Sequence, residues 1–171
     1  LYGSAGYGTQ PHLTMELFLM MAKVRMGHVA YKGGAPGITD LVAGQIALMT
    51  SSSLSLLIPH ARSGRVRALA VTSGTRHHAL PEVPTVAEGG LPGYESVQWA
   101  GLLAPSGTPR ELIARLQRET SAILRAPENR DRLRTDGSDV VASTPEEFGT
   151  FIQSEIAKWA KVAQAAGIQP E

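Results

Sequence analysis

The chain contains no cysteine, carries almost no net charge and has no long apolar run. The missing cysteines exclude disulfides and thiolate metal sites and are compatible with any cellular compartment. The formal net charge of +1 comes from interspersed basic and acidic residues, so no electrostatic footprint for nucleic acid is present. No apolar run approaches the roughly 20 residues that cross a bilayer. What remains, with 43% hydrophobic and 18% charged residues in 171, is the composition of a globular protein.

A glycine-rich stretch from Gly3 to Leu13 leads directly into an apolar periodic segment. Its three glycines and two hydroxyl side chains, Ser4 and Thr9, precede Pro11, which favours the first turn of a helix. Amides at a helix start lack intrahelical partners and the helix dipole favours negative charge there. Such a turn therefore binds phosphate, sulfate or carboxylate. A tight turn that holds only water is the alternative, and the local sequence leaves both open.

Short strands alternate with helices over the first seventy residues. After a strand end at residues 1–2, the pattern predicts helices over 11–24, 36–42 and 54–61 and strands over 28–31, 46–49 and 66–71. This rhythm with short connections predicts an α/β fold, a parallel sheet with helices on both faces. Because ligands bind beyond the carboxyl ends of such strands, we expect the loops 3–9, 32–36 and 50–53 along one edge as an anion site.

The second half of the chain reads as a linker followed by scaffold. Residues 73–94 are polar and rich in proline and glycine, which predicts a domain boundary. Strands are expected over 97–104 and 140–141. Helices are expected to start at two capping boxes, Thr108–Glu111 and Thr144–Glu147, and at Pro127.

No catalytic grouping stands out in the sequence. The dinucleotide fingerprint begun by Gly6-Tyr7-Gly8 is incomplete because Pro11 occupies the third glycine position. His12, the titratable side chain nearest the loop, is expected to pack against or orient it rather than act as a base. The adjacent His77 and His78 have no third ligand nearby, so structural histidines and no metal are expected. We therefore predict a binding protein that is not an enzyme and needs no cofactor.

Several stretches carry a resemblance to a known family. They begin with Tyr2-Gly3-Ser4-Ala5-Gly6-Tyr7-Gly8-Thr9-Gln10-Pro11-His12-Leu13 and continue with residues 28–36, 39–46, 59–72, 80–88, 92–95, 99–105 and 144–167. In this order, over essentially the whole chain, they resemble the periplasmic solute-binding receptors of tripartite tricarboxylate transporters, called Bug receptors in Bordetella.

The resemblance implies a periplasmic binding protein type II fold of the Venus-flytrap form. Residues 1–94 would be most of ligand-binding domain 2, and residues 95–171 the C-terminal portion of domain 1. The signal peptide and most of domain 1 would precede this piece of a longer protein. The expected location is the periplasm, and the expected partners are the membrane components of the transporter. Because missing strands would leave core surface exposed, self-association or modest stability is expected.

The resemblance also implies a small organic carboxylate as ligand, held in the cleft between the domains. The contacts would come mostly from backbone amides. The implied ligand-binding residues are Ser4, Ala5, Gly6, Tyr7, Gly8, Thr9, Lys32, Gly33, Gly34, Ala35, Thr50 and Ser51. The family often has an aromatic residue and then Asp or Asn after the third strand, where this chain has Thr50-Ser51-Ser52-Ser53. We hypothesise that losing the acidic side chain disfavours amino-acid ligands, whose ammonium needs a partner.

Two other functions fit the same loop. One is an enzyme acting on a phosphorylated or nucleotide ligand, and the other is a non-binding interaction module or gene remnant. The three differ in what occupies the helix start near Pro11: a planar carboxylate, a tetrahedral phosphate or water alone.

Overall fold

The computed structural model describes residues 1–51 and 53–169, which form two compact units. The first unit contains Leu1–Gln98 and the chain from Trp159 onward, and the second contains Trp99–Lys158. The expected division into residues 1–94 and 95–171 stays a prediction. The compact units differ from it, because the first unit continues to Gln98 and also takes in the chain from Trp159 onward. No helix in the described part of the chain is both long and apolar enough to cross a membrane.

A three-stranded parallel sheet forms the centre of the first unit, in the order β2-β1-β3. The register places Tyr2 of the central strand opposite both His28 and Leu48. The parallel pairing of both neighbours confirms the prediction from the β-α-β rhythm. The strands are β1 (Tyr2–Ser4), β2 (His28–Ala30) and β3 (Leu48–Met49).

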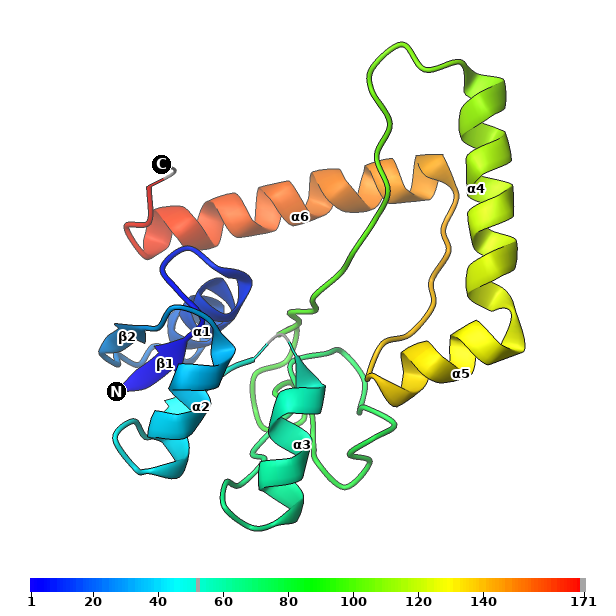
Figure 1. Cartoon of the computed structure of the whole chain (residues 1–171). Helices are drawn as coiled ribbons and strands as arrows, with labels where there is room; N and C mark the ends of the chain where they lie inside the picture. The colour runs from blue at the N-terminus through cyan, green and yellow to red at the C-terminus, as the bar shows by residue number, and fades with distance from the viewer. Residues whose placement is uncertain (52, 170–171) are drawn as a thin grey trace. The chain divides into compact units, whose positions relative to one another are not determined.

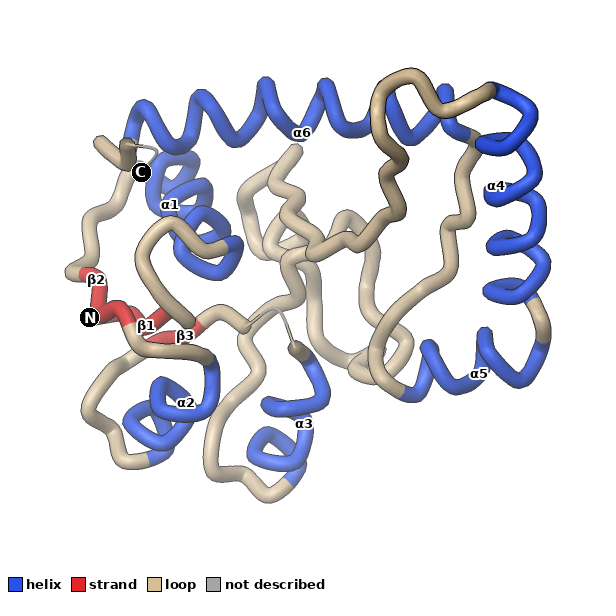
Figure 2. Tube along the Cα trace, turned by 45° about the horizontal axis from the view of Figure 1, so that its top comes forward, coloured by secondary structure: helices blue, strands red, loops and turns tan. Residues whose placement is uncertain are grey.

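Helices cover both faces of this sheet, as predicted. In Figure 2, α1 lies on one side of the strands and α2 and α3 on the other. Successive strand residues point to opposite faces. Tyr2 therefore packs with Met15 and Leu19 of α1, whereas Met49 packs with Ile38 of α2. The helices are α1 (Gln10–Ala22), α2 (Gly34–Val42) and α3 (Leu54–Arg62).

Helix α1 is buried on a second side by chain segments from far along the sequence. Leu17 packs with Tyr94 and Val162, which belong to the same unit. A hydrogen-bond network adds to this contact: the hydroxyls of Thr14 and Ser96 lie 2.7 Å apart, and both are buried. Figure 1 shows the C-terminal end of α6 beside α1. The helix that carries the glycine-rich loop is thus fixed from two directions.

The predicted strand over residues 66–71 is wrong. Within the described residues this segment makes a single parallel bridge, between Val71 and Thr85. Leu69 is 57% exposed, and no described strand lies alongside the segment to form a ladder. Residues 73–94 consist of turns and bends around the Thr85 bridge and belong to the first compact unit, so their role as a domain boundary stays a prediction.

The second unit contains α4 (Arg110–Arg125), α5 (Pro127–Thr135) and the start of α6 (Pro145–Ala165). The Thr144–Glu147 capping box is confirmed, with reciprocal hydrogen bonds of 2.8 and 3.2 Å. The box at Thr108 is wrong, because the Thr108 hydroxyl donates to the Pro105 carbonyl instead. The strands predicted over 97–104 and 140–141 are also wrong, since both segments are irregular.

Candidate ligand-binding site

The loops that follow the three strands meet at one edge of the sheet. The Gly33 amide donates to the Ala5 carbonyl over 2.9 Å, which joins the second loop to the first. The Thr50 hydroxyl donates to the Pro11 carbonyl over 2.7 Å, which joins the third loop to the first turn of α1. Ser52, within the third predicted loop, lies outside the described residues. The predicted convergence at one edge is confirmed for the described residues.

The glycine-rich loop, residues 4–9, is stiffened by its own side chains. The Ser4 hydroxyl donates to the Gly6 carbonyl over 2.9 Å and accepts from the Gly6 amide over 3.2 Å. The Thr9 hydroxyl donates to the same carbonyl over 2.7 Å. Gly8 has φ +69°, a left-handed conformation that side chains other than Asn and Asp rarely adopt. The loop is therefore shaped before any ligand arrives.

Some amides of this loop are used internally and others are not. The Gly8 amide donates to Nδ1 of His12 over 3.0 Å. The amides of Tyr7, Gln10 and His12 donate to no acceptor among residues 1–51 and 53–169. Such amides at a helix start carry partial positive charge and are suited to an anion.

Four aromatic rings form a column beneath the loop, in the order Tyr2, His28, His12, Tyr7. The centroids of successive rings lie 4.9, 3.9 and 4.9 Å apart. Tyr2 is fully buried at one end, whereas Tyr7 is 60% exposed at the other. We call this set the ring column. It connects the buried side of β1 to the surface of the loop.

Both histidines of the ring column favour the neutral form. Burial lowers the pKa of His12 below its ordinary value of 6.5, and nearby Glu16 opposes this to a lesser extent. Burial and the neighbouring His12 likewise lower the pKa of His28. In neutral His12, Nδ1 accepts from Gly8, so the proton lies on Nε2, which is 3.7 Å from the Glu16 carboxylate.

Ser4 and His28 meet in a way that invites comparison with a nucleophile and its base. The Ser4 hydroxyl oxygen lies 2.7 Å from Nε2 of His28. Ser4 has 0% exposure and gives its hydrogen to the Gly6 carbonyl, so the imidazole Nε2–H donates to the serine oxygen. A buried hydroxyl that accepts from its histidine is not an activated nucleophile. The pair is structural.

The residues predicted to bind ligand lie around this sheet edge at different depths. Ser4 is buried, whereas Tyr7, Gly8, Lys32 and Ala35 are exposed. The remainder are half-buried: Ala5, Gly6, Thr9, Gly33, Gly34, Thr50 and Ser51. The Gly33 amide already donates to the Ala5 carbonyl, so Gly33 can contact a ligand through its own carbonyl. Their roles as ligand contacts stay predictions.

Sequence reasoning singled out His12 but missed its partners. Tyr2, Glu16 and His28 belong to three different elements, and the Tyr2 hydroxyl donates to Glu16 over 2.5 Å. A usable signal exists: in parallel strands the residue opposite Tyr2 shares its face, and His28 begins the second strand. That register becomes known only from the folded sheet.

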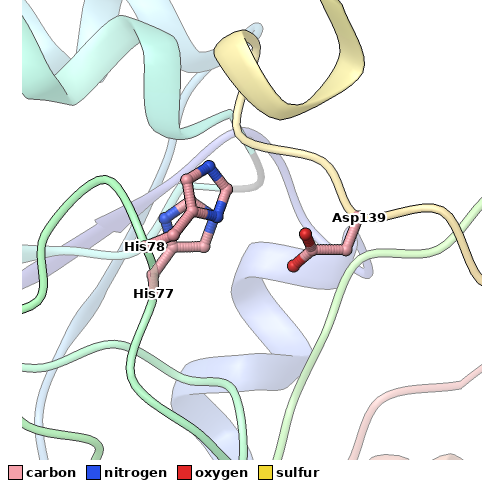
Figure 3. Close-up of side chains that lie close together, drawn as sticks. All are labelled: His77, His78 and Asp139. Atoms are coloured by element: carbon pink, nitrogen blue, oxygen red, sulfur yellow. The ribbon is translucent and has the colours of Figure 1, made fainter. Parts of the chain in front are cut away.

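The second pair of histidines behaves differently. The rings of His77 and His78 lie 4.2 Å apart and are half-buried (Figure 3). Nδ1 of His77 accepts the Ala79 amide over 3.2 Å, which fixes its ring within the turn. Asp139, also drawn in Figure 3, belongs to the second unit. The contact to Ala79 is a structural one.

A parallel sheet whose strand-to-helix loops meet at one edge is the arrangement in which α/β domains bind ligands. Residues 1–168 match the family described as "Tripartite tricarboxylate transporter family receptor". The chain belongs to this receptor family, as the resemblance predicted.

Three relatives that are about twice as long as this chain support the same assignment. A UPF0065 protein from the tcbD-tcbE intergenic region of Pseudomonas sp. strain P51 is 41% identical over 94% of this chain, which spans 48% of that protein. R. palustris Rpa4515, solved with adipate, is 38% identical with TM-score 0.82 over 99% of this chain and 56% of its own. MatC from Rhodopseudomonas palustris, solved with bound malate, is 30% identical with TM-score 0.72 over 94% of this chain and 55% of its own. The fold is thus that of the periplasmic binding proteins, represented here by about half of a relative's length.

Proposed function

We propose that the chain is part of an extracytoplasmic solute-binding receptor that captures a small organic carboxylate in the periplasm. The loaded receptor delivers this ligand to the membrane components of a tripartite tricarboxylate transporter. The observation that carries the proposal is the meeting of three strand-to-helix loops at one sheet edge, held by the Gly33–Ala5 and Thr50–Pro11 hydrogen bonds. The family, and the adipate and malate with which two relatives were solved, support a carboxylate as the anion.

The proposed binding group is the glycine-rich loop with the first turn of α1. The amides of Tyr7, Gln10 and His12 supply hydrogen-bond donors, and the helix dipole supplies positive potential. Lys32, exposed on the neighbouring loop, supplies the one formal positive charge among residues 32–36. Thr9, Thr50 and Ser51 supply hydroxyls at the same edge, which suits the oxygens of a carboxylate.

A thermal-shift screen of mono-, di- and tricarboxylates tests the proposal, with the adipate-binding R. palustris protein as positive control. A ligand that binds the folded state stabilises it by about 2.7 kcal/mol at a hundred times its Kd. We expect saturable stabilisation of this chain by at least one carboxylate, with adipate and malate as first probes. Inorganic phosphate and a nucleotide form the comparison arm. Stabilisation by these alone would favour the enzyme hypothesis, and no response to any anion would favour the non-binding module.

Charge placed at the loop localises the site. Gly8 and Gly44 both have positive φ, and a Cβ added to either meets no atom within 4 Å. Gly8→Asp sets a carboxylate beside the ligand, whereas Gly8→Asn adds nearly the same shape and strain without charge. We expect Gly8→Asp to weaken binding about ten- to a hundredfold relative to Gly8→Asn. Gly44→Asp, beyond the end of α2, is the control for added charge and should bind like the unmodified chain.

A further inference from the structure

His12 sits between the ligand loop and the buried part of the ring column. The residue is 3% exposed, with Nδ1 facing the Gly8 amide at 3.0 Å and Nε2 facing Glu16 at 3.7 Å. One imidazole edge therefore touches the loop backbone, and the other touches a carboxylate. No other side chain among the described residues accepts from the Gly8 amide.

The neutral form of His12 is the form that fits this geometry. Nδ1 of a neutral imidazole accepts the Gly8 N–H, whereas a proton on Nδ1 sets two donors against each other at that distance. The Gly8 peptide then loses its partner and is free to rotate. Because Gly8 lies between Tyr7 and the first turn of α1, such a rotation disturbs the neighbouring amides proposed to bind the ligand.

A charged imidazole near the loop attracts an anion as well, so two effects oppose each other. The Glu16 carboxylate lies against Nε2 and offsets the added positive charge at short range. The loss of the Gly8 hydrogen bond has no such compensation. The geometric effect therefore dominates.

We propose that His12 is a positioning residue of the ligand site, and that tight carboxylate binding requires its unprotonated Nδ1 to hold the Gly8 amide. This inference rests on the proposed function. Binding of the carboxylate then weakens as the pH falls through the titration range of His12. Within that range, where His12 is partly protonated, ligand binding releases a proton. The receptor would hold its ligand at neutral pH and release it more readily in acid.

The groups that face His12 come from every element packed around it. Tyr2 contributes from β1, His28 from β2, Tyr7 from the loop and Glu16 from α1. Arg25 lines a groove of about 330 Å³ together with Glu16. The lowered pKa of both histidines agrees with imidazoles that are neutral at pH 7.5.

Three variants separate positioning from packing. His12→Asn keeps an acceptor near the place of Nδ1 but does not titrate, and His12→Leu keeps bulk but offers no acceptor. His60→Asn removes an imidazole from the last turn of α3, away from the ring column. At pH 7.5 we expect His12→Leu to weaken adipate or malate binding roughly three- to tenfold, and His12→Asn to restore most of that loss.

The pH profile is the decisive measurement. Titration calorimetry with adipate and with malate, from pH 5 to 8 in buffers of two ionisation enthalpies, gives affinity and proton release. In the unmodified chain and in His60→Asn, affinity should fall by up to tenfold per pH unit below the His12 titration. In His12→Asn only the titration of the ligand itself should remain. An equal profile in His12→Asn and the unmodified chain, or affinity that rises in acid, would overturn the proposal.

A measurement without ligand separates this inference from the proposed function. NMR of the free chain follows the Gly8 amide and the His12 ring across the same pH range. The two signals should titrate with one midpoint, and the Gly8 titration should vanish in His12→Asn. A Gly8 amide that ignores His12 contradicts the coupling. Coupled titration in a chain that binds no carboxylate supports the coupling and contradicts the proposed function.

Discussion

The imidazoles of His12 and His28 stack face to face, with centroids 3.9 Å apart and planes 8° from parallel. One ring comes from the first turn of α1 and the other from the start of β2. Two rings this close cannot both be charged without mutual repulsion, and burial already disfavours either charge. The stack therefore makes both stability and the proposed binding sensitive to acid.

Stability should fall as the pH drops below 6.5. Both histidines have a folded pKa below that ordinary value, so the unfolded chain binds more protons in this window. Their contribution is complete above pH 6.5 and decreases in acid by up to about 1.4 kcal/mol per pH unit for each histidine.

Urea unfolding between pH 5 and 8 measures this slope. The double variant His12→Asn/His28→Gln should flatten it, since neither replacement titrates. His60→Asn serves as the control and should keep the slope. An unchanged slope in the double variant would assign the acid sensitivity to other groups.

A methyl group on Gly3 should destabilise the central strand. A Cβ there would lie 2.5 Å from Cδ1 of Ile46 and 3.0 Å from the Tyr31 ring. We expect Gly3→Ala to cost about 1–3 kcal/mol by overpacking.

Ile46→Val deletes the obstructing Cδ1 and tests this cause. Alone it should cost about 0.5–1.5 kcal/mol, but in combination with Gly3→Ala the costs should sum to less than the two single values. Denaturant unfolding of the two single variants and the double variant completes this double-mutant cycle. Additive costs would show that the crowding is relieved elsewhere.

Ser96→Ala should weaken the attachment of α1 to the segment that follows the linker. The buried Ser96 hydroxyl meets Thr14 at 2.7 Å and accepts from Gln10 at 3.0 Å. Its loss leaves polar groups without a partner, which should lower the free energy of unfolding by about 1–3 kcal/mol. Ser63→Ala, at an exposed serine after α3, should change unfolding by less than 0.5 kcal/mol, roughly the size of a neutral surface change.

The chain should associate with itself as its concentration rises. Leu102, Leu103 and Val141 of the second unit are 78%, 79% and 77% exposed. The segment over residues 97–104 is irregular, so its backbone is open to pairing with another copy. Sedimentation velocity should show dimers or larger species that Leu102→Ser/Leu103→Ser reduces, whereas the surface variant Glu119→Ser leaves them. A chain that stays monomeric at all concentrations contradicts this prediction.

The first half of the fold could be predicted because its signals are local and repeat. Glycine or proline marks the start of α1 and α2, and a short apolar run marks the strand before α2. Parallel pairing then follows from the rhythm, because short connections through helices return each strand in the same direction. The Thr144–Glu147 box could be predicted for the same reason, since all its atoms lie within one turn.

The wrong strands show where local signals end. Residues 66–71 and 97–104 have apolar composition typical of strands, yet a strand forms only beside a partner with free backbone groups. Val71 finds such a partner in Thr85 at a single bridge, and the rest of both segments has none among the described residues. Composition alone does not show whether a neighbouring strand is present to pair with.

The sequence by itself determined the family, the parallel α/β architecture and the glycine-rich loop with its helix start. The tertiary structure decided how that loop is supported. Tyr2, Tyr7, His12 and His28 become one column of rings because the register of β1 with β2 and the packing of α1 bring them together. The chemistry of each side chain follows from the identity of its residue. Contact between distant residues depends on strand pairing and helix packing, which only the folded chain fixes.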